Sequence, residues 1–411
     1  MHILWLKTEF LHPVDKGGRI RTYQMLRALS RSHRVTYLTL DDGGAAPDAM
    51  ERAAEYSRDV LTVPFAPPAR GTLSFYADLA RNLLSSLPYA IAKYRSAAFA
   101  LEVRRLAGSV DVVVCDFLPP AVNLAGPLGV PSVLFQHNVE AEIWRRHADV
   151  ASSFVAGAYF RQQWRRMVRF EGDACRRFDQ VVAVSDQDAA HMRRAYRLEN
   201  VTAIPTGVDL DYFHADGPPP PGSSELVFTG SMDWLPNEDA VLWFAEAILP
   251  RIHAKRPDAS LTIVGRNPTS RVLALARRHA AVTVTGTVPD VRPFLRRGAA
   301  LVVPLRIGGG TRLKIYEAMA MGVPVISTSI GAEGLPLVPG EHFLRADTPE
   351  GLADACVGAL EDPASARAMG HQGAQYVHRS FGWDRVSEAF ATICADVVRH
   401  SARSARQRSL E

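Results

Sequence analysis

Length, composition and charge limit what this chain can be. It has 411 residues, of which 47% are apolar and 22% are charged, and its formal net charge is +4. This composition is typical of a globular protein, and the length suits two domains of about 200 residues each. Residues 1–205 carry all of the positive excess, with 26 Lys and Arg against 21 Asp and Glu. The small net charge and the lack of a known reader motif argue against nucleic acid as a partner.

The cysteines indicate a reducing compartment. There are four of them, Cys115, Cys175, Cys356 and Cys394. They are far apart and form no CxxC pair, which argues against a disulfide framework and against a zinc site. Near the start of the chain, Lys7 and Glu9 interrupt the apolar stretch too early for a signal peptide. We therefore expect a cytoplasmic protein.

Short apolar runs alternate with helical stretches along the whole chain. Most runs are continuously apolar, as expected for strands buried on both faces of a parallel sheet. The expected strands of the first half are 2–6, 34–40, 112–115, 132–135, 180–184 and 201–204. Those of the second half are 226–229, 260–264, 282–285, 300–303 and 325–328. The sequence therefore predicts an α/β protein with two Rossmann-like domains, whose parallel sheets face a cleft.

Two features of the first half lie where ligands of such sheets bind, beyond the carboxyl ends of strands. Gly17 and Gly18 begin a predicted helix after the first strand, and a glycine pair there lets a sugar diphosphate approach the helix N-terminus, although such pairs also occur in plain turns. His137, in FQHNVEAEIW, follows another buried strand. Its ring suits acid–base chemistry or a hydrogen bond to a sugar, and a capping or packing role is the alternative.

Residues 144–177 combine arginines with aromatic side chains. The arginines are Arg145, Arg146, Arg161, Arg165, Arg166, Arg169, Arg176 and Arg177. A basic, aromatic helix is typical of proteins that bind the surface of an anionic membrane. Here the expected surface is the inner face of the membrane. The equally weighted alternative is an amphipathic helix whose aromatic side packs on the sheet while its arginines stay in water.

Two acidic pairs resemble metal-binding DxD motifs. Asp186 and Asp188 follow Ser185 at the start of a predicted helix, where they serve as caps and dipole partners. Asp209 and Asp211 lie in a turn before residues 214–224, HADGPPPPGSS. We interpret both pairs as structural and predict no metal site.

The proline-rich segment 214–224 divides the chain. Four consecutive prolines fit neither a helix nor a central strand, so this segment is a semi-rigid linker. We expect an N-terminal domain over residues 1–213 and a C-terminal domain over residues 225–380. In ELVFTGSMDWLPN, Gly230 and Ser231 end the first strand of the second domain and can line the phosphate or base side of a ligand, while Asn237 is expected to cap the next helix. Arg266 ends another strand and is a weaker candidate for the same role.

The stretch PLRIGGGTRLKIYEAMAMGVPVIST carries the strongest signal. The loop Gly308, Gly309, Gly310 and Thr311 lets the backbone approach a ligand closely. Arg312 and Lys314 add two charges beside a helix N-terminus, so the loop predicts an anion site suited to a diphosphate. Glu317, one turn after Lys314, suits the hydroxyls of a ribose. Diphosphate and ribose together indicate a nucleotide, and the alternative is a solvated helix after a turn.

The quoted segments resemble glycosyltransferase family 4, whose members are retaining enzymes with the GT-B fold. The resemblance covers most of the chain through KGGRIRTYQMLRAL, HNVE, VSDQD, IPTGVDLDYF, FTGSMDWLPN and GGGTRLKIYEAMAMGVPVIST. It implies that Glu317 is the second glutamate of the family's Glu-x7-Glu motif and that His137 lies near the donor sugar. Gly309 occupies the place of the first glutamate, and Ser231, Met232 and Asp233 stand where the family often has Arg and Lys. We assign the chain to a GGGTRLK-x-x-EAMA subgroup in which Arg312 and Lys314 take the phosphate role.

The resemblance also implies that residues 1–213 form the acceptor-side domain and residues 225–380 the nucleotide-sugar-binding domain, and it implies an activity and a C-terminal element. The expected reaction moves a sugar from a UDP- or GDP-linked donor to a glycan or lipid-linked acceptor with retention of configuration, without a further cofactor. The expected helix over residues 381–400 crosses back to the first domain, and residues 401–411 are expected to form a disordered tail. A nucleotide-sugar 2-epimerase and a non-catalytic nucleotide-sugar-binding protein are the alternatives. The donor, the acceptor, the linkage and the oligomeric state are not specified by the sequence.

Overall fold

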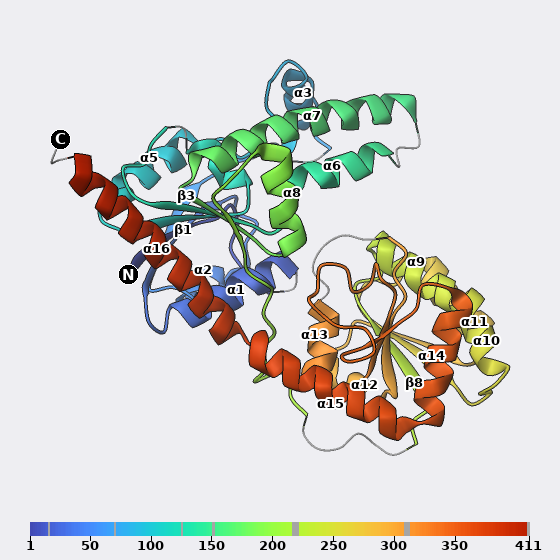
Figure 1. Cartoon of the computed structure of the whole chain (residues 1–411). Helices are drawn as coiled ribbons and strands as arrows, with labels where there is room; N and C mark the ends of the chain where they lie inside the picture. Colours follow the sequence, from blue (N-terminus) through green and yellow to red (C-terminus); the bar gives the residue numbers. More distant parts are fainter. Residues whose placement is uncertain are drawn as a thin grey trace. The chain divides into compact units, whose positions relative to one another are not determined.

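Two parallel sheets organise the chain. The computed structural model describes residues 1–14, 17–69, 71–124, 126–149, 153–215, 222–307 and 313–408. Contacts divide the chain into unit 1, which comprises Met1–Pro205 and Asp384–Glu411, and unit 2, which comprises Thr206–Trp383. Figure 1 shows the helices and strands of each unit.

Unit 1 contains a seven-stranded, fully parallel sheet in the order β3-β2-β1-β4-β5-β6-β7. Its strands are β1 His2–Leu6, β2 Arg34–Asp41, β3 Asp59–Pro64, β4 Val112–Asp116, β5 Ser132–Gln136, β6 Gln180–Ala183 and β7 Val201–Ala203. Its helices are α1 Gly17–Leu29, α2 Ala49–Arg52, α3 Leu73–Asn82, α4 Tyr89–Ala92, α5 Ala97–Ala107, α6 Glu140–Asp149, α7 Phe154–Arg177 and α8 Asp186–Tyr196, with short 3-10 turns at Ala53–Glu55 and Pro119–Asn123.

The strand order of unit 1 fixes where a ligand can bind. The chain lays down β1, β2 and β3 in one direction and then returns to add β4 on the other side of β1. Connections therefore leave β1 and β4 toward opposite faces, which opens a crevice at their carboxyl ends. All five residues of β4 and of β5 are buried, because helices cover both faces of the sheet.

The C-terminal helix α16, Trp383–Arg408, belongs to unit 1 from Asp384 onward. Phe390 is fully buried, with its ring 5.5 Å from that of Trp5 and 5.1 Å from that of Phe135. Arg31 forms an ion pair with Asp384 at 2.8 Å. Helix α16 therefore packs in the same core as β1, although the two elements are more than 350 positions apart in the sequence.

Unit 2 repeats the same topology with six parallel strands in the order β10-β9-β8-β11-β12-β13. The strands are β8 Glu225–Thr229, β9 Ser260–Val264, β10 Val282–Gly286, β11 Ala300–Val303, β12 Val325–Ser327 and β13 Leu344–Arg345. The helices are α9 Leu235–Trp243, α10 Leu249–His253, α11 Ser270–Arg278, α12 Arg292–Arg297, α13 Leu313–Ala320, α14 Pro349–Glu361 and α15 Pro363–Ser380. A short π-helix at Phe244–Ile248 joins α9 to α10. Here the order reverses between β8 and β11.

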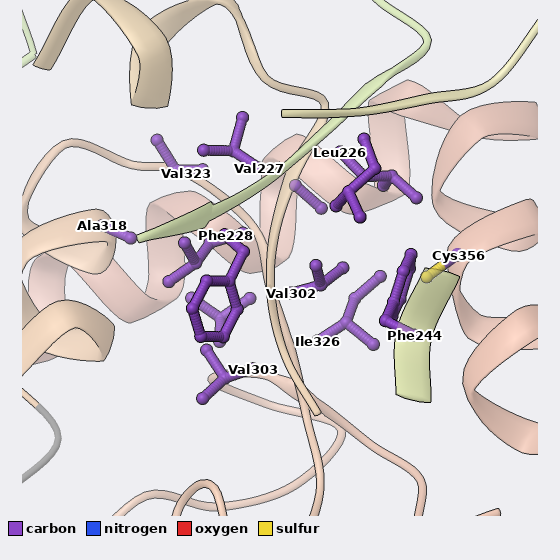
Figure 2. Close-up of a cluster of buried hydrophobic side chains, with 14 of the residues drawn as sticks. Leu226, Val227, Phe228, Phe244, Val302, Val303, Ala318, Val323, Ile326 and Cys356 are labelled. Carbon is purple, nitrogen blue, oxygen red and sulfur yellow. The ribbon is translucent and has the colours of Figure 1, made fainter. Parts of the chain in front are cut away.

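Apolar side chains on both faces of this second sheet build the core of unit 2. Figure 2 shows Phe228 and Val303 on one side and Phe244 with Cys356 on the other. Phe228 and Phe244 are each about 1% exposed. Burying an aromatic side chain of this size stabilises the fold by roughly 1.5–3 kcal/mol.

The prediction of two parallel α/β sheets is confirmed, and three details differ from it. β3 and β13 were not expected, because Asp59–Pro64 is mostly half-buried and β13 has only two residues. Residues 206–213 were assigned to the first domain but pack in unit 2, where Val208 donates its N–H to the carbonyl oxygen of Phe381 at 2.7 Å. The expected tail is also wrong for 401–408, since α16 continues to Arg408 through Ala, Arg and Gln, which favour helix.

Candidate functional site

At the strand reversal of unit 1, three charged or titratable side chains are buried together. Lys7 follows β1, Asp116 ends β4 and His137 follows β5. Lys7 Nζ lies 2.7 Å from Asp116 Oδ2, and His137 Nε2 lies 2.7 Å from Asp116 Oδ1. Lys7 is 3% exposed, Asp116 0% and His137 3%. The carboxyl ends of three adjacent strands therefore form one polar cluster inside an apolar core.

Asp116 is held as an ion by its donors. Besides Lys7, its Oδ2 accepts hydrogen bonds from Thr22 Oγ1 at 2.7 Å and from Trp5 Nε1 at 3.1 Å. Burial by itself would raise the pKa of this carboxyl, but Lys7 and His137 outweigh burial and lower it below its usual range. Lys7 Nζ also donates to Thr22 Oγ1 at 3.0 Å and lies 4.2 Å from the centre of the Phe117 ring.

His137 is uncharged in this setting. Burial is the main cause that lowers its pKa to about 3, against the opposing effect of Asp116. Its ring stacks on Phe117 with 3.8 Å between centroids, and its Nδ1 is buried without a hydrogen-bond partner among the described residues. The sequence identified His137 but missed Lys7 and Asp116. The available signal was a charged residue at the end of each of two otherwise apolar strands, LWLK and VVVCD.

Gly17 and Gly18 are the first two residues of α1, as the sequence predicted. A Cβ on Gly18 would lie 2.8 Å from the tip of the Phe117 ring, whereas one on Gly17 would meet no atom. Phe117 itself adopts a left-handed backbone with φ of 67°. The glycine at 18 therefore lets α1 approach the ring on which His137 stacks.

A second buried carboxylate anchors the segment that follows His137. Glu171 of α7 accepts hydrogen bonds from the backbone N–H groups of Glu140 and Ala141 at the start of α6, and from Tyr196 Oη at 2.6 Å. Gln136 Nε2 donates to it as well, at 3.1 Å. Burial raises the pKa of Glu171 to about 7, and burial together with Glu171 does the same for Glu140.

In unit 2, the loops after β8 and β9 lie directly against each other. Gly230 donates to Val264, and Met232 donates to Arg266, at 3.0 and 2.9 Å. A Cβ on Gly265 would lie 1.7 Å from the carbonyl oxygen of Gly230, so only glycine fits there. This close approach holds the two loops together at the carboxyl ends of β8 and β9, next to the strand reversal between β8 and β11.

Lys314 of α13 reaches this edge. Its Nζ donates to Asn237 Oδ1 at 3.0 Å and lies 4.1 Å from the centre of the Phe228 ring. A Cβ on Gly230 would come within 2.8 Å of the same nitrogen. Asn237 Nδ2 donates to the Ser231 carbonyl at 2.9 Å, so Asn237 bridges the loop and the lysine. The prediction that Asn237 caps a helix is wrong, since it lies inside α9, whose N-cap Trp234 makes no side-chain cap bond.

Ser231 and Arg266 also meet. Arg266 Nε donates to Ser231 Oγ at 2.9 Å, and Ser231 Oγ donates to Asp233 Oδ1. Hydrogen bonds from Ser231 and from Asn267 lower the pKa of Asp233. The structure thus brings Gly230, Ser231, Arg266 and Lys314 to one edge of the unit 2 sheet.

Glu317 lies on α13, one turn after Lys314. It is half-buried and makes no hydrogen bond or ion pair with another residue of the described part of the chain. Burial raises the pKa of its carboxyl to about 7, and the nearby charge of Lys314 acts against this shift. A carboxylate in such a position is suited to accept hydrogen bonds from ligand hydroxyls. The other predicted residues of this site, Gly308, Gly309, Gly310, Thr311 and Arg312, lie outside the described residues.

The acidic pairs are used in local structure. Ser185 Oγ accepts from the Asp188 backbone N–H at 3.0 Å and caps α8, and Asp209 Oδ1 accepts from the Tyr212 N–H at 3.0 Å. Within the described ranges, no group of three or more His, Cys, Asp or Glu side chains is arranged to hold a metal ion. The absence of a metal from the function stays a prediction.

Several side chains of residues 144–177 pack as those of an ordinary amphipathic helix do. Trp144, Trp164 and Phe170 lie against the core of unit 1. Among the arginines, Arg145 pairs with Glu142, Arg176 with Asp173, and Arg166 donates to the carbonyl oxygens of Asn82 and Leu83. Phe154 and Val155, at the start of α7, remain 85% and 77% exposed.

Comparison with known proteins shows which class of protein these two units resemble. Residues 16–212 match the family model described as Glycosyltransferase Family 4, and residues 223–362 match the model described as Glycosyl transferases group 1. Both units are therefore similar to glycosyltransferases of these two descriptions. The first model covers Thr22, Asp116 and His137 of the buried cluster, and the second covers Lys314 and Glu317.

Named relatives of this family 4-like chain include two mycobacterial enzymes. Glycogen synthase of Mycobacterium tuberculosis is 28% identical over 286 residues, which cover 67% of this chain and 65% of that protein. Phosphatidyl-myo-inositol mannosyltransferase of Mycolicibacterium smegmatis is 30% identical over 219 residues, which cover 50% of this chain and 54% of that protein. The chain thus spans less than two-thirds of the length of either relative.

Solved structures share the fold of this glycosyltransferase-like chain. Sucrose-phosphate synthase from Thermosynechococcus elongatus matches with a TM-score of 0.68 at 18% identity, over 97% of this chain and 100% of that one. Anabaena Alr3699/HepE, solved in complex with UDP, matches with a TM-score of 0.68 at 12% identity, over 96% and 100%. The two parallel sheets therefore have the GT-B fold. In the part of the chain that the structure describes, every helix is too short or too polar to span a bilayer.

Proposed function

We propose that the protein transfers a sugar from a nucleotide-diphosphate sugar to a glycan or lipid-linked acceptor, with retention of configuration. The observation that carries this proposal is the pair on α13, where Lys314 reaches the strand reversal of unit 2 and Glu317 lies one turn later without a partner among the described residues. The family matches over both units support it, and HepE, a protein of the same fold, was solved with UDP and with UDP-glucose.

The chemistry follows from the charges. When the sugar leaves the donor, negative charge grows on the diphosphate, so a fixed cation stabilises the transition state more than the ground state. Lys314 supplies such a cation, Arg312 is proposed to supply a second, and the backbone around Gly230 allows close approach. Glu317 accepts hydrogen bonds from the ribose. The donor is UDP- or GDP-linked, and neither a metal nor a further cofactor is required.

Product analysis tests this proposal. The protein is incubated with UDP- and GDP-sugars, with and without glycan and lipid-linked acceptors, in EDTA and in Mg²⁺. We expect an acceptor-dependent product whose anomeric configuration matches that of the donor. Isomerised nucleotide sugar formed without acceptor would instead indicate a 2-epimerase, and donor binding without turnover would indicate a binding protein of the subgroup in which Gly309 replaces a glutamate.

We also propose that the acceptor side of unit 1 contacts an anionic membrane surface, on the cytoplasmic side of the membrane. Exposed apolar side chains occur on and directly after α3 and at the start of α7, and the end of α3 is tied to α7 by the Arg166 hydrogen bonds to Asn82 and Leu83. They are Leu73, Tyr76, Leu84, Phe154 and Val155. Exposed Arg161, Arg165 and Arg169 lie on α7 as well. All four cysteines are free and buried, which supports a reducing compartment.

Vesicle sedimentation tests the membrane contact. The anionic vesicles contain about 30% anionic lipid. The protein should bind them more tightly than neutral vesicles, by about 1 kcal/mol for each arginine near the surface, and this binding should weaken as salt is added. Replacing Arg161, Arg165 and Arg169 with Gln should weaken it, whereas replacing the paired Arg176 should not. Equal binding to neutral and anionic vesicles would contradict the proposal.

A further inference from the structure

The two oxygens of Asp116 have different surroundings. Oδ2 accepts from three donors, Lys7 Nζ, Thr22 Oγ1 and Trp5 Nε1, whereas Oδ1 faces His137 Nε2 at 2.7 Å. An ionised carboxylate can only accept hydrogen bonds, so the proton in the second contact belongs to Nε2 of the imidazole. A neutral ring with a proton on Nε2 has a lone pair on Nδ1.

That lone pair lacks a donor among the described residues. Nδ1 of His137 is buried and has no hydrogen-bond partner in the described ranges. Buried acceptors are nearly always paired, so an unpaired acceptor at a strand reversal is a candidate to receive a hydrogen bond from a ligand. An acceptor repels phosphate oxygens, which are also acceptors, and it favours a group that carries a hydrogen, such as a sugar hydroxyl.

We propose that Lys7 and Asp116 are positioning residues, which hold His137 as its neutral Nε2–H tautomer so that Nδ1 accepts a hydrogen bond from a hydroxyl of the bound sugar. The inference rests on the proposed glycosyl transfer and deepens it. Lys7 keeps Asp116 ionised, Asp116 orients the ring, and the ring of Phe117 stacks against it at 3.8 Å. His137 then contacts the substrate as a neutral acceptor, without acting as an acid or a base.

The charges around the ring agree with a neutral histidine. Lys7 after β1 and Arg21 on α1 both lower the pKa of His137, Asp116 on β4 raises it, and burial is the largest cause of the net decrease. The aromatic ring of Phe135 on β5 lies 4.5 Å away and adds no charge. Protonation of the ring is therefore not expected between pH 5 and 8, where an ordinary histidine titrates.

The decisive variant is Asp116→Asn. Because three donors converge on one side of the residue, the amide will turn its oxygen toward Lys7, Thr22 and Trp5 and present its NH₂ to His137. Nε2 must then accept, the proton moves to Nδ1, and the lone pair offered to the sugar is lost. In enzymes where a carboxylate fixes a histidine tautomer, this change lowers kcat by up to about 10⁴-fold.

The tautomer can be read directly by ¹⁵N NMR of protein labelled at histidine, with His137→Gln used to assign the resonances. The wild type should show a protonated Nε2 and an unprotonated Nδ1 from pH 5 to 8, and Asp116→Asn should reverse them. Asp59→Asn, which alters a carboxylate of unit 1 that pairs with Arg34 outside the cluster, is the matched control and should leave the His137 shifts unchanged. A wild-type spectrum with a protonated Nδ1, or with histidinium at pH 7, would overturn the inference even if sugar transfer is confirmed.

Kinetics tests the hydrogen bond to the sugar. Asp116→Asn should lower kcat at least 100-fold with the natural sugar and much less with the one deoxy-sugar that lacks the contacted hydroxyl. The wild-type pH profile should keep its shape in His137→Gln, because any titration near pH 7 belongs to other groups. If Asp116→Asn retains turnover within twofold, the positioning role is wrong. If the wild type transfers no sugar at all, the proposed function fails, and the sugar as the ligand of Nδ1 fails with it.

Discussion

The two units use one topology to build two different kinds of polar site. Each sheet reverses its strand order once, between β1 and β4 or between β8 and β11, and each carries polar side chains near that reversal. In unit 1 the charges are buried and matched within the protein, since Lys7 and Asp116 pair at 2.7 Å. In unit 2, Lys314 is half-buried against an amide oxygen, and Glu317 has no partner in the described part of the chain.

This difference separates stability from binding. A buried ion pair whose partners satisfy each other contributes a rigid frame, and removal of one partner leaves an uncompensated charge in the core. Under the proposed function, a half-buried cation and a half-buried carboxylate one turn apart contact the bound donor instead. Substitutions in unit 1 should therefore reduce folding stability first, and substitutions in unit 2 should reduce donor affinity first.

The largest effect is expected from Lys7→Met. It leaves Asp116 ionised and buried, which should lower the free energy of unfolding of unit 1 by about 3–5 kcal/mol. Hydrogen exchange followed by mass spectrometry should show this loss in peptides from β1 and β4. The double variant Lys7→Met/Asp116→Leu removes both charges and should recover most of the stability. A loss below 1 kcal/mol in the single variant would mean that the pair is not a structural frame.

Lys314→Met should instead act on binding. Methionine keeps the packing on Phe228 but removes the charge, so the affinity for a nucleotide sugar should fall by about 1.5–3 kcal/mol, the scale of a hydrogen bond to a charged group. Calorimetric titration measures this loss, and the melting temperature without ligand should stay within about 2 °C. Arg312→Ala is expected to cause a similar loss. Unchanged affinity in both variants would remove the phosphate assignment.

Donor binding should depend on pH through Glu317. Its pKa is raised to about 7, and ribose hydroxyls are best accepted by the ionised carboxylate. Affinity for a nucleotide sugar should therefore decrease as the pH falls from 8 to 6, because binding must then also remove a proton. The diphosphate diester of the donor does not titrate in this range. Glu317→Gln should bind more weakly and without this pH dependence, and a pH dependence that persists in the variant would assign it to another group.

The smallest effects should come from the neutral neighbours of the two cations. Thr22→Val removes one donor to Asp116 and should cost about 1 kcal/mol of stability. Asn237→Ala removes the oxygen that holds Lys314 and should cost about 1 kcal/mol of donor affinity with little effect on unfolding. Chemical denaturation and calorimetry applied to both variants make the comparison complete. If Thr22→Val lowered donor affinity and Asn237→Ala lowered stability instead, the comparison between the two units would be contradicted.

The sequence predicted the parts of this structure that depend on local pattern. Continuous apolar runs such as VVVC and ALVV identified strands buried on both faces, because nothing except burial on both sides favours such runs. The pattern failed for β3, where DVLTVP is mostly half-buried and ends in proline, and for the two-residue β13. It also failed at the end of α16, where a polar, arginine-rich run was interpreted as a tail.

The site was only partly predictable for a related reason. His137, Lys314 and Glu317 stand in recognisable motifs, so the sequence proposed each of them as a site residue. Lys7 and Asp116 are 109 positions apart, and only the pairing of β1 with β4 brings them together. A single charge at the end of an apolar run has no meaning until the strand order is known. The order itself depends on long-range pairing that local periodicity does not encode.

One measurement tests the central claim most directly, which is that unit 2 binds the diphosphate and ribose of a nucleotide sugar. Calorimetric titration of the wild type and of Lys314→Met with UDP- and GDP-sugars, in EDTA, gives the affinity of each. We predict that one nucleotide class binds the wild type without metal and that the substitution weakens this binding by at least tenfold. No binding of any nucleotide sugar, or equal affinity in the two proteins, would contradict the account.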